Sequence, residues 1–180
     1  MIQSRVTRRY ANALFELAFE KNQVSEISDD LRKIQEVCTS SEDFIRLLDS
    51  PVIQVSEKKQ VLSRLFEKRI HPLTFYFLEL LLEKNRENLL PDTIKYFMRL
   101  VDDSQGIMRG ELQTAYLLSE QQIEALKKRL DRITGKNVLL HQNINPDLLG
   151  GFMVKLDDTV IDTSIRNQLL KMRENFLSNA

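Results

Sequence analysis

Residues 118–123 read Leu-Ser-Glu-Gln-Gln-Ile, and this short stretch decides how the last third of the chain folds. Ser119 stands where an N-cap residue belongs, and Gln122 stands three residues later, so the two can form a capping box. The apolar residues that flank this pair are spaced as a hydrophobic staple. Helical spacing then continues until Gly135, a natural C-cap. The stretch therefore predicts a helix with a clear beginning and a clear end.

Segments of strand type surround this helix. Residues 107–115 have extended-type content, and three short apolar runs follow the helix, at 138–140, 152–156 and 160–161. Asp162 or Ser164 is then placed to cap a last helix. The apolar stripe of that helix consists of Ile165, Leu169, Met172 and Phe176. The order β-α-β-β-β-α predicts a small α+β domain over residues 106–180.

The first hundred residues have helical spacing and almost no strand signal. Ser56 is the predicted N-cap of a fourth helix, and Pro72 the predicted first residue of a fifth. We expect six short helices in all, packed as a bundle over residues 1–105. The polar stretch 102–106 marks the boundary between the two domains. The predicted fold class is therefore α+β with two domains.

Composition excludes several classes of protein. The 26 basic residues balance 26 acidic ones, so no net field attracts nucleic acid or an anionic membrane. The only cysteine, Cys38, excludes an internal disulfide and is typical of a reducing compartment. No apolar segment long enough for a signal peptide or a membrane span is visible. We expect any association with a membrane to go through another protein.

Two of the expected helices carry more apolar surface than one core needs. The helix around residues 6–18 has a second flank formed by Ala11, Phe15 and Ala18, and residues 75–82 are apolar nearly all round. Two interpretations stay open from the residues alone. Both helices can be central in the bundle, or part of their surface can line a groove for an amphipathic helix of a partner.

No catalytic, metal or cofactor site is predicted. Four aspartates cluster in sequence, Asp147, Asp157, Asp158 and Asp162, but they lack the regular ligand spacing of a calcium loop and are favoured in turns and caps. Phosphate-binding glycine patterns are absent, and no serine has a paired histidine and aspartate. His71, beside a proline at a helix start, is interpreted as a solvated surface residue.

Several short motifs, in order along the whole chain, carry a resemblance to a known family. They are Arg9-Tyr10-Ala11, Asn85-Arg86, Leu89-Leu90-Pro91, Thr114-Ala115, Leu118-Ser119, Leu149-Gly150-Gly151 and Asp162-x-Ser164. Together they resemble the delta subunits of bacterial F-type ATP synthases, the family of the oligomycin-sensitivity-conferring protein. The chain has Asp157-Asp158 and Asp162-Thr163-Ser164 where this family favours Gly-Asp and Asp-Gly-Ser. Neither departure removes a functional group.

The resemblance implies a non-catalytic stator subunit that couples ion flow to ATP synthesis. Its six-helix N-terminal domain is expected to bind the N-terminal helix of an alpha subunit of the catalytic head. Its C-terminal domain is expected to bind the peripheral stalk b subunits. The alpha contact carries over to Tyr10, Ala13, Leu14, Leu17, Leu78 and Leu82. Periodicity does not tell which of these residues face the partner and which face the core.

The same resemblance implies a place at the cytoplasmic face of the bacterial inner membrane, reached only through the complex, with no cofactor and no small-molecule substrate. The alternative function is a nucleic-acid-binding module that uses the small domain as a sheet platform. It requires aromatic residues on the strands and a basic face. Only Phe152 is available, and the net charge is zero. A metal-dependent hydrolase using the aspartates is the other rival.

Overall fold

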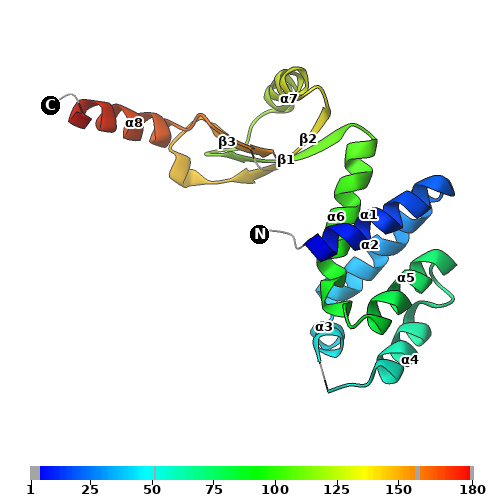
Figure 1. Cartoon of the computed structure of the whole chain (residues 1–180). Coiled ribbons are helices and arrows are strands. Elements are labelled where there is room, and N and C mark those ends of the chain that lie inside the picture. Colours follow the sequence, from blue (N-terminus) through cyan, green and yellow to red (C-terminus); the bar gives the residue numbers. More distant parts are fainter. Residues whose placement is uncertain (1–4, 51, 157–158, 179–180) are drawn as a thin grey trace. The chain divides into compact units, whose positions relative to one another are not determined.

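The structure is a computed structural model that describes residues 5–50, 52–156 and 159–178 (Figure 1). The chain divides into two compact units, Met1–Val101 and Asp102–Ala180. The sequence places this boundary between residues 105 and 106. Each unit has its own hydrophobic core. The fold combines helices with a four-stranded sheet, so the predicted mixed class is confirmed.

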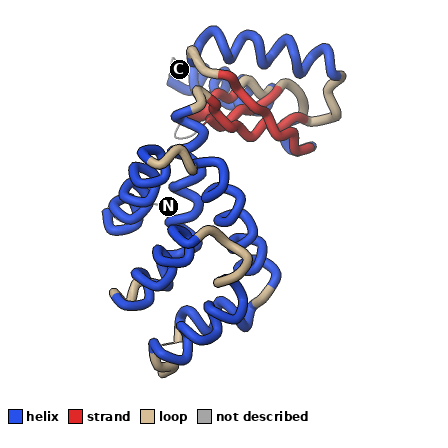
Figure 2. The backbone as a smooth tube through the Cα atoms, turned by 90° about the vertical axis from the view of Figure 1, so that its right-hand side faces the viewer, coloured by secondary structure: helices blue, strands red, loops and turns tan. Residues whose placement is uncertain are grey.

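The described part of the first unit is helical (Figure 2). Its elements are α1 (Arg5–Glu20), α2 (Val24–Ser40), α3 (Glu42–Asp49), α4 (Val55–Phe66), α5 (Pro72–Glu83), the 3-10 helix η1 (Glu87–Leu89) and α6 (Leu90–Ser104). Pro72 opens α5 as predicted. The prediction for the fourth helix is wrong in detail, because Gln54 is the N-cap and Ser56 lies inside α4.

A buried carboxylate fastens the start of α5 to α2. Asp30 is 5% exposed, and its Oδ2 accepts hydrogen bonds from the His71 backbone N–H at 2.6 Å and the Thr74 hydroxyl at 3.3 Å. Its Oδ1 lies 3.2 Å from the Lys33 ammonium. His71 is half-buried rather than solvated, and its Nδ1 caps α5 by accepting from the Leu73 N–H at 3.2 Å. The side chain of His71 therefore serves a structural purpose.

A buried ion pair holds α4 against η1. The Lys58 ammonium lies 2.6 Å from Glu87 Oε1 and also donates to the Leu48 carbonyl at 2.8 Å. Only 3% of the Lys58 side chain is exposed. Removing one partner of such a pair leaves an uncompensated buried charge. The pair therefore fixes how the helices of this unit meet.

The second unit is a small layer of helix on sheet. Its elements are β1 (Ile107–Thr114), α7 (Glu120–Thr134), β2 (Asn137–Ile144), η2 (Pro146–Leu148), β3 (Phe152–Leu156), β4 (Thr159–Asp162) and α8 (Ile165–Ser178). The strand order is β2-β1-β3-β4. The β1–β2 pair is parallel, with α7 as its crossover, and the other two pairs are antiparallel.

Residues 118–123 begin α7 with the predicted capping box. The Ser119 hydroxyl accepts from the Gln122 N–H at 3.3 Å, and the Gln122 side chain accepts from the Ser119 N–H at 2.9 Å, which completes the capping box. Gly135 ends the helix in the left-handed conformation, at φ 69°. α7 lies over one face of the sheet (Figure 1). The core between them is formed by Leu112, Leu130, Val138, Val154 and Leu156.

Candidate partner-binding surfaces

One flank of α1 exposes an apolar stripe. The buried side of this helix consists of Thr7, Ala11, Leu14 and Ala18. Beside it run Val6, Tyr10, Ala13 and Leu17, at the spacing of a single helix face. Leu17 is 44% exposed, and Ala13 is exposed as well, whereas Tyr10 is half-buried. This row is accessible to a partner without any change in the core.

The stripe continues onto α5. The Tyr10 ring meets the Phe77 ring edge to face, with centroids 6.5 Å apart. Leu73 and Leu80 stand four residues before and three after Phe77, so they lie on the same side of α5, and both are half-buried. Tyr76 is 62% exposed. We call Leu73, Tyr76 and Leu80 of α5, together with Val6, Tyr10, Ala13 and Leu17 of α1, the α1–α5 surface.

The structure divides the six predicted contact residues into two groups. Tyr10, Ala13 and Leu17 belong to the α1–α5 surface. Leu14, Leu78 and Leu82 are at most 2% exposed and lie in the core of the first unit. Four members of the surface are absent from the sequence-based set: Val6, Leu73, Tyr76 and Leu80. Their signal was available, because Val6 keeps helical spacing with Tyr10, and Tyr76 keeps it with Leu73 and Leu80.

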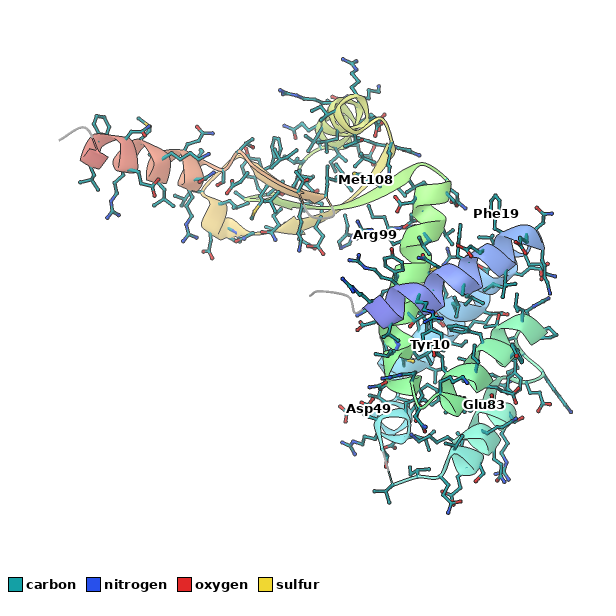
Figure 3. The ribbon with its side chains drawn as sticks, viewed as in Figure 1. Tyr10, Phe19, Asp49, Glu83, Arg99 and Met108 are labelled. Carbon is teal, nitrogen blue, oxygen red and sulfur yellow. The ribbon has the colours of Figure 1, made fainter. Side chains whose placement is uncertain are left out.

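The opposite flank of α1 faces α6. The Phe15 ring meets Phe97 of α6 edge to face at 5.9 Å and stacks on Phe19 at 6.1 Å, and the Arg8 guanidinium lies over the Tyr96 ring. Tyr10 and Phe19 thus lie on different sides of α1 (Figure 3). Ala13 is exposed, whereas Ala11 and Ala18, which the sequence places on this second flank, are fully buried. They serve packing within the unit.

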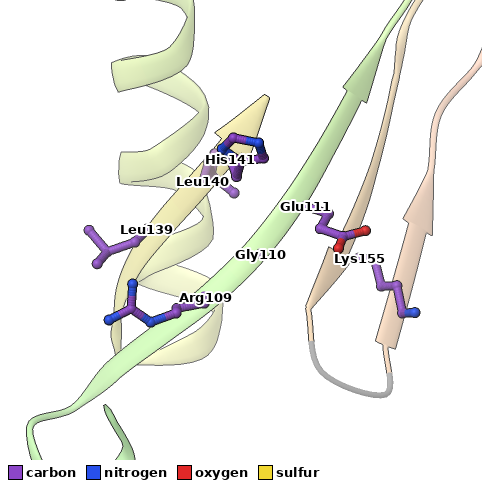
Figure 4. Close-up of a pocket in the computed structure, with 7 residues that line it drawn as sticks. All are labelled: Arg109, Gly110, Glu111, Leu139, Leu140, His141 and Lys155. Atoms are coloured by element: carbon purple, nitrogen blue, oxygen red, sulfur yellow. The ribbon is translucent and has the colours of Figure 1, made fainter. Parts of the chain in front are cut away.

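A hollow of about 490 Å³ opens on the sheet face that α7 does not cover. It is lined by Arg109, Gly110, Glu111, Leu139, Leu140, His141 and Lys155 (Figure 4). Glu111 is in register with His141 on one side and with Lys155 on the other, so a carboxylate stands between an imidazole and an ammonium group across the strands. Among the described residues that line the hollow, the His141 imidazole is the one aromatic ring, and Phe152 packs toward the core instead. This face lacks the stacking platform that the nucleic-acid alternative requires.

The second unit exposes a further apolar surface on α8. Six large apolar side chains of this helix are about half exposed or more: Ile165, Leu169, Leu170, Met172, Phe176 and Leu177. Its first turn is anchored, because the Ile165 N–H donates to the Gly150 carbonyl at 3.0 Å. The preceding residue, Leu149, is 67% exposed and adopts a left-handed φ of 62°. Apart from η2, α8 makes no substantial packing contact with a described helix or strand.

The residues that could suggest chemistry have structural functions. The Ser164 hydroxyl accepts from the Asn167 N–H at 3.2 Å, so Ser164 is the one of the two predicted residues that caps α8, and the Asp162 carboxylate accepts from the Ser164 N–H at 2.9 Å in the turn before the helix. Asp157 and Asp158 lie outside the described residues. Burial raises the pKa of the Cys38 thiol to about 11, which keeps it protonated. Within the described ranges, no three histidine, cysteine or carboxylate side chains are grouped to hold a metal ion.

Comparisons with known proteins agree with this picture. The family described as ATP synthase delta (OSCP) subunit matches residues 6–176. ATP synthase subunit delta of Chlorobaculum parvum is 36% identical over 178 residues, 99% of this chain and 98% of the relative. The same subunit of Carboxydothermus hydrogenoformans is 38% identical over 170 residues, 94% of this chain and 96% of the relative.

Among solved structures, a chain of the Toxoplasma gondii mitochondrial ATP synthase hexamer matches with a TM-score of 0.71 and 25% identity, over 97% of this chain and 98% of that one. No helix in the part of this chain that the structure describes is long and apolar enough to cross a membrane. The chain therefore belongs to the ATP synthase delta (OSCP) family and is a non-catalytic subunit of an ATP synthase complex.

Proposed function

We propose that this chain is the stator link of an F-type ATP synthase. It joins the catalytic hexamer of alpha and beta subunits to the peripheral stalk b subunits, so that ion flow is coupled to ATP synthesis. In a bacterial cell this places it at the cytoplasmic face of the inner membrane, held there by the complex. The observation that carries the proposal is that a non-catalytic member of this family exposes an apolar surface on each of its two units.

The first unit, with helices α1–α6 acting as one bundle, binds the N-terminal helix of an alpha subunit on the α1–α5 surface. An amphipathic helix binds such a strip through side chains at helical spacing. Tyr10, Ala13 and Leu17 make the direct contact. Leu14, Leu78 and Leu82 contribute from the core, where they hold α1 and α5 in position. The second unit binds the stalk b subunits.

The work of the protein is mechanical. A stator must stay attached while the rotor exerts torque, which requires slow dissociation from both neighbours. Slow dissociation comes from a few well-packed apolar anchors rather than from exposed ion pairs, which contribute little. The edge-to-face packing of Tyr10 on Phe77 supplies such an anchor, since it holds the tyrosine ring rigidly at the surface.

The test uses full-length chain and a synthetic peptide of the alpha N-terminal segment from the same organism, with affinity measured by calorimetry. Tyr10→Asp and Leu17→Asp should each weaken binding about 10-fold or more, because each buries an unpaired carboxylate. Phe19→Asp, on the opposite flank of α1, is the matched control and should retain the affinity of the unmodified chain. If folded Tyr10→Asp and Leu17→Asp variants bind as well as that chain, the α1–α5 surface is not the alpha site.

A further inference from the structure

The exposed face of α8 contains two arginines between two rows of apolar residues. Successive residues turn by about 100° around a helix. Ile165, Leu169, Met172 and Phe176 therefore form one row, and Leu170 with Leu177 form a second. Arg166 and Arg173, seven residues apart, fall between the rows. The remaining side of the helix is polar and includes Lys171 and Glu174.

We propose that α8 binds an amphipathic helix that places carboxylates opposite Arg166 and Arg173. This proposal rests on the proposed function, in which the second unit binds the stalk b subunits, and it specifies the chemistry of that contact. The first apolar row follows intervals of four, three and four residues, the spacing by which two helices pack along a seam. Its occupant is therefore a helix of the stalk rather than a loop.

The arginines determine the charge of the occupant. Neither Arg166 nor Arg173 forms an ion pair with a carboxylate in the described part of the chain. Any helix that covers both apolar rows also removes the guanidinium groups from water. A buried guanidinium without a partner is strongly unfavourable, so the covering helix has to supply carboxylate side chains. Two carboxylates about seven residues apart match the spacing of the arginines.

Two other occupants fit less well. A second copy of α8 would set its own arginine row against this one, which opposes pairing through like charges. A helix that lies in a lipid surface carries its lysines and arginines on the polar face, where they meet the headgroups. In α8 the arginines lie between apolar rows, so insertion into lipid would draw them toward the acyl chains. An acidic helix satisfies both the apolar rows and the charges.

The experiment measures binding of the full-length chain to the soluble part of the stalk b subunits from the same organism, by calorimetry at low and moderate salt. The double charge reversal Arg166→Glu with Arg173→Glu should weaken binding about 30-fold or more, since it sets carboxylate against carboxylate. Arg166→Lys with Arg173→Lys should retain most of the affinity. Lys171→Glu, on the polar side of α8, is the matched control and should change affinity less than about 3-fold. Circular dichroism verifies that each variant folds.

The outcomes separate this proposal from the proposed function. If the unmodified chain binds the stalk and the charge-reversed chain binds it equally well, the acidic-helix proposal is wrong and the stator function survives. If the unmodified chain does not bind the stalk at all, both are wrong. Cosedimentation of the full-length chain with phosphatidylglycerol vesicles tests whether α8 binds a lipid surface instead. Vesicle binding that depends on Arg166 and Arg173, without stalk binding, would overturn the proposal in favour of a membrane contact.

Discussion

α7 and α8 belong to the same unit and are similar in length, at 15 and 14 residues, and both carry an apolar stripe at helical spacing. α7 buries Leu130 to 3% exposure against the sheet. α8 has no fully buried residue among those described, and Phe176 is 73% exposed. The difference shows that periodicity reveals an apolar face without revealing what covers it. For α7 the cover is the sheet of its own unit, whereas among the described elements only η2 packs substantially on α8 and its apolar face stays exposed.

The largest expected effect separates the two helices directly. Leu130→Asp should destabilise the second unit by about 3 kcal/mol or more, because it buries a carboxylate in an apolar core. Leu169→Asp, on α8, should change stability by about 0.5 kcal/mol or less, since that side chain is already 55% exposed. Urea unfolding followed by circular dichroism measures both. Equal losses of stability from the two substitutions would show that α8 is part of the folded core.

A smaller effect concerns the joint between the sheet and α8. Gly151 has a left-handed φ of 73°, and a Cβ at this position would lie 2.5 Å from the Thr163 carbonyl oxygen. Gly151→Ala should therefore destabilise the second unit by about 1–3 kcal/mol, through the strained conformation and the contact with backbone. Gly135→Ala is the control, since it has a similar φ of 69° but open space around it. A Gly151→Ala variant no less stable than the control would contradict this packing.

The smallest effect compares the caps of the two helices. Ser119→Ala removes half of the capping box of α7 and should lower the stability of the second unit by about 1 kcal/mol. Ser164→Ala removes the cap of α8 and should reduce helicity while leaving the melting midpoint of the sheet nearly unchanged, because α8 contributes little to that core. Far-ultraviolet circular dichroism across a thermal melt distinguishes the two. A larger shift of the melting midpoint from Ser164→Ala than from Ser119→Ala would show that α8 contributes more than α7 to the stability of the second unit.

Much of the second unit could be predicted because its signals are local. The capping box of Ser119 and Gln122, the glycine that ends α7 and the Asp162 turn with the Ser164 cap all involve residues a few positions apart. Their hydrogen bonds form within one helical turn whatever the rest of the chain does. The sequence shows the Leu149-Gly150-Gly151 motif but not why a glycine is needed there. The structure gives the reason for Gly151, which lies close to the backbone at Thr163.

Long-range contacts explain what the sequence did not reveal. His71 looked solvated because its partner Asp30 lies 41 residues away. α6 ends at Ser104, inside the polar stretch 102–106 that marks the predicted boundary. The carboxylate of Asp102 in its last turn accepts from the Arg109 guanidinium at 2.7 and 2.9 Å, and the hydrogen bond raises the pKa of that arginine. None of these pairings has a local signature.

The prediction of partner-contact residues from the sequence is limited in the same way. Leu14 and Leu17 share the apolar period of α1, yet one is buried at 2% exposure and the other is 44% exposed. Periodicity places both on the apolar side, and only the positions of the neighbouring helices decide which one remains accessible. The same reasoning applies to Leu78 and Leu82, which the surrounding helices enclose completely.

The proposed function requires that one chain hold two partners at once, on separate surfaces. The most direct measurement adds the alpha N-terminal peptide and the soluble stalk b subunits together to the full-length chain and determines the composition of the complex by analytical ultracentrifugation. We expect a ternary complex, from which Leu17→Asp removes only the peptide and the Arg166→Glu, Arg173→Glu double substitution removes only the stalk. Displacement of one partner by the other, or loss of both partners through a single one of these changes, would contradict the stator link.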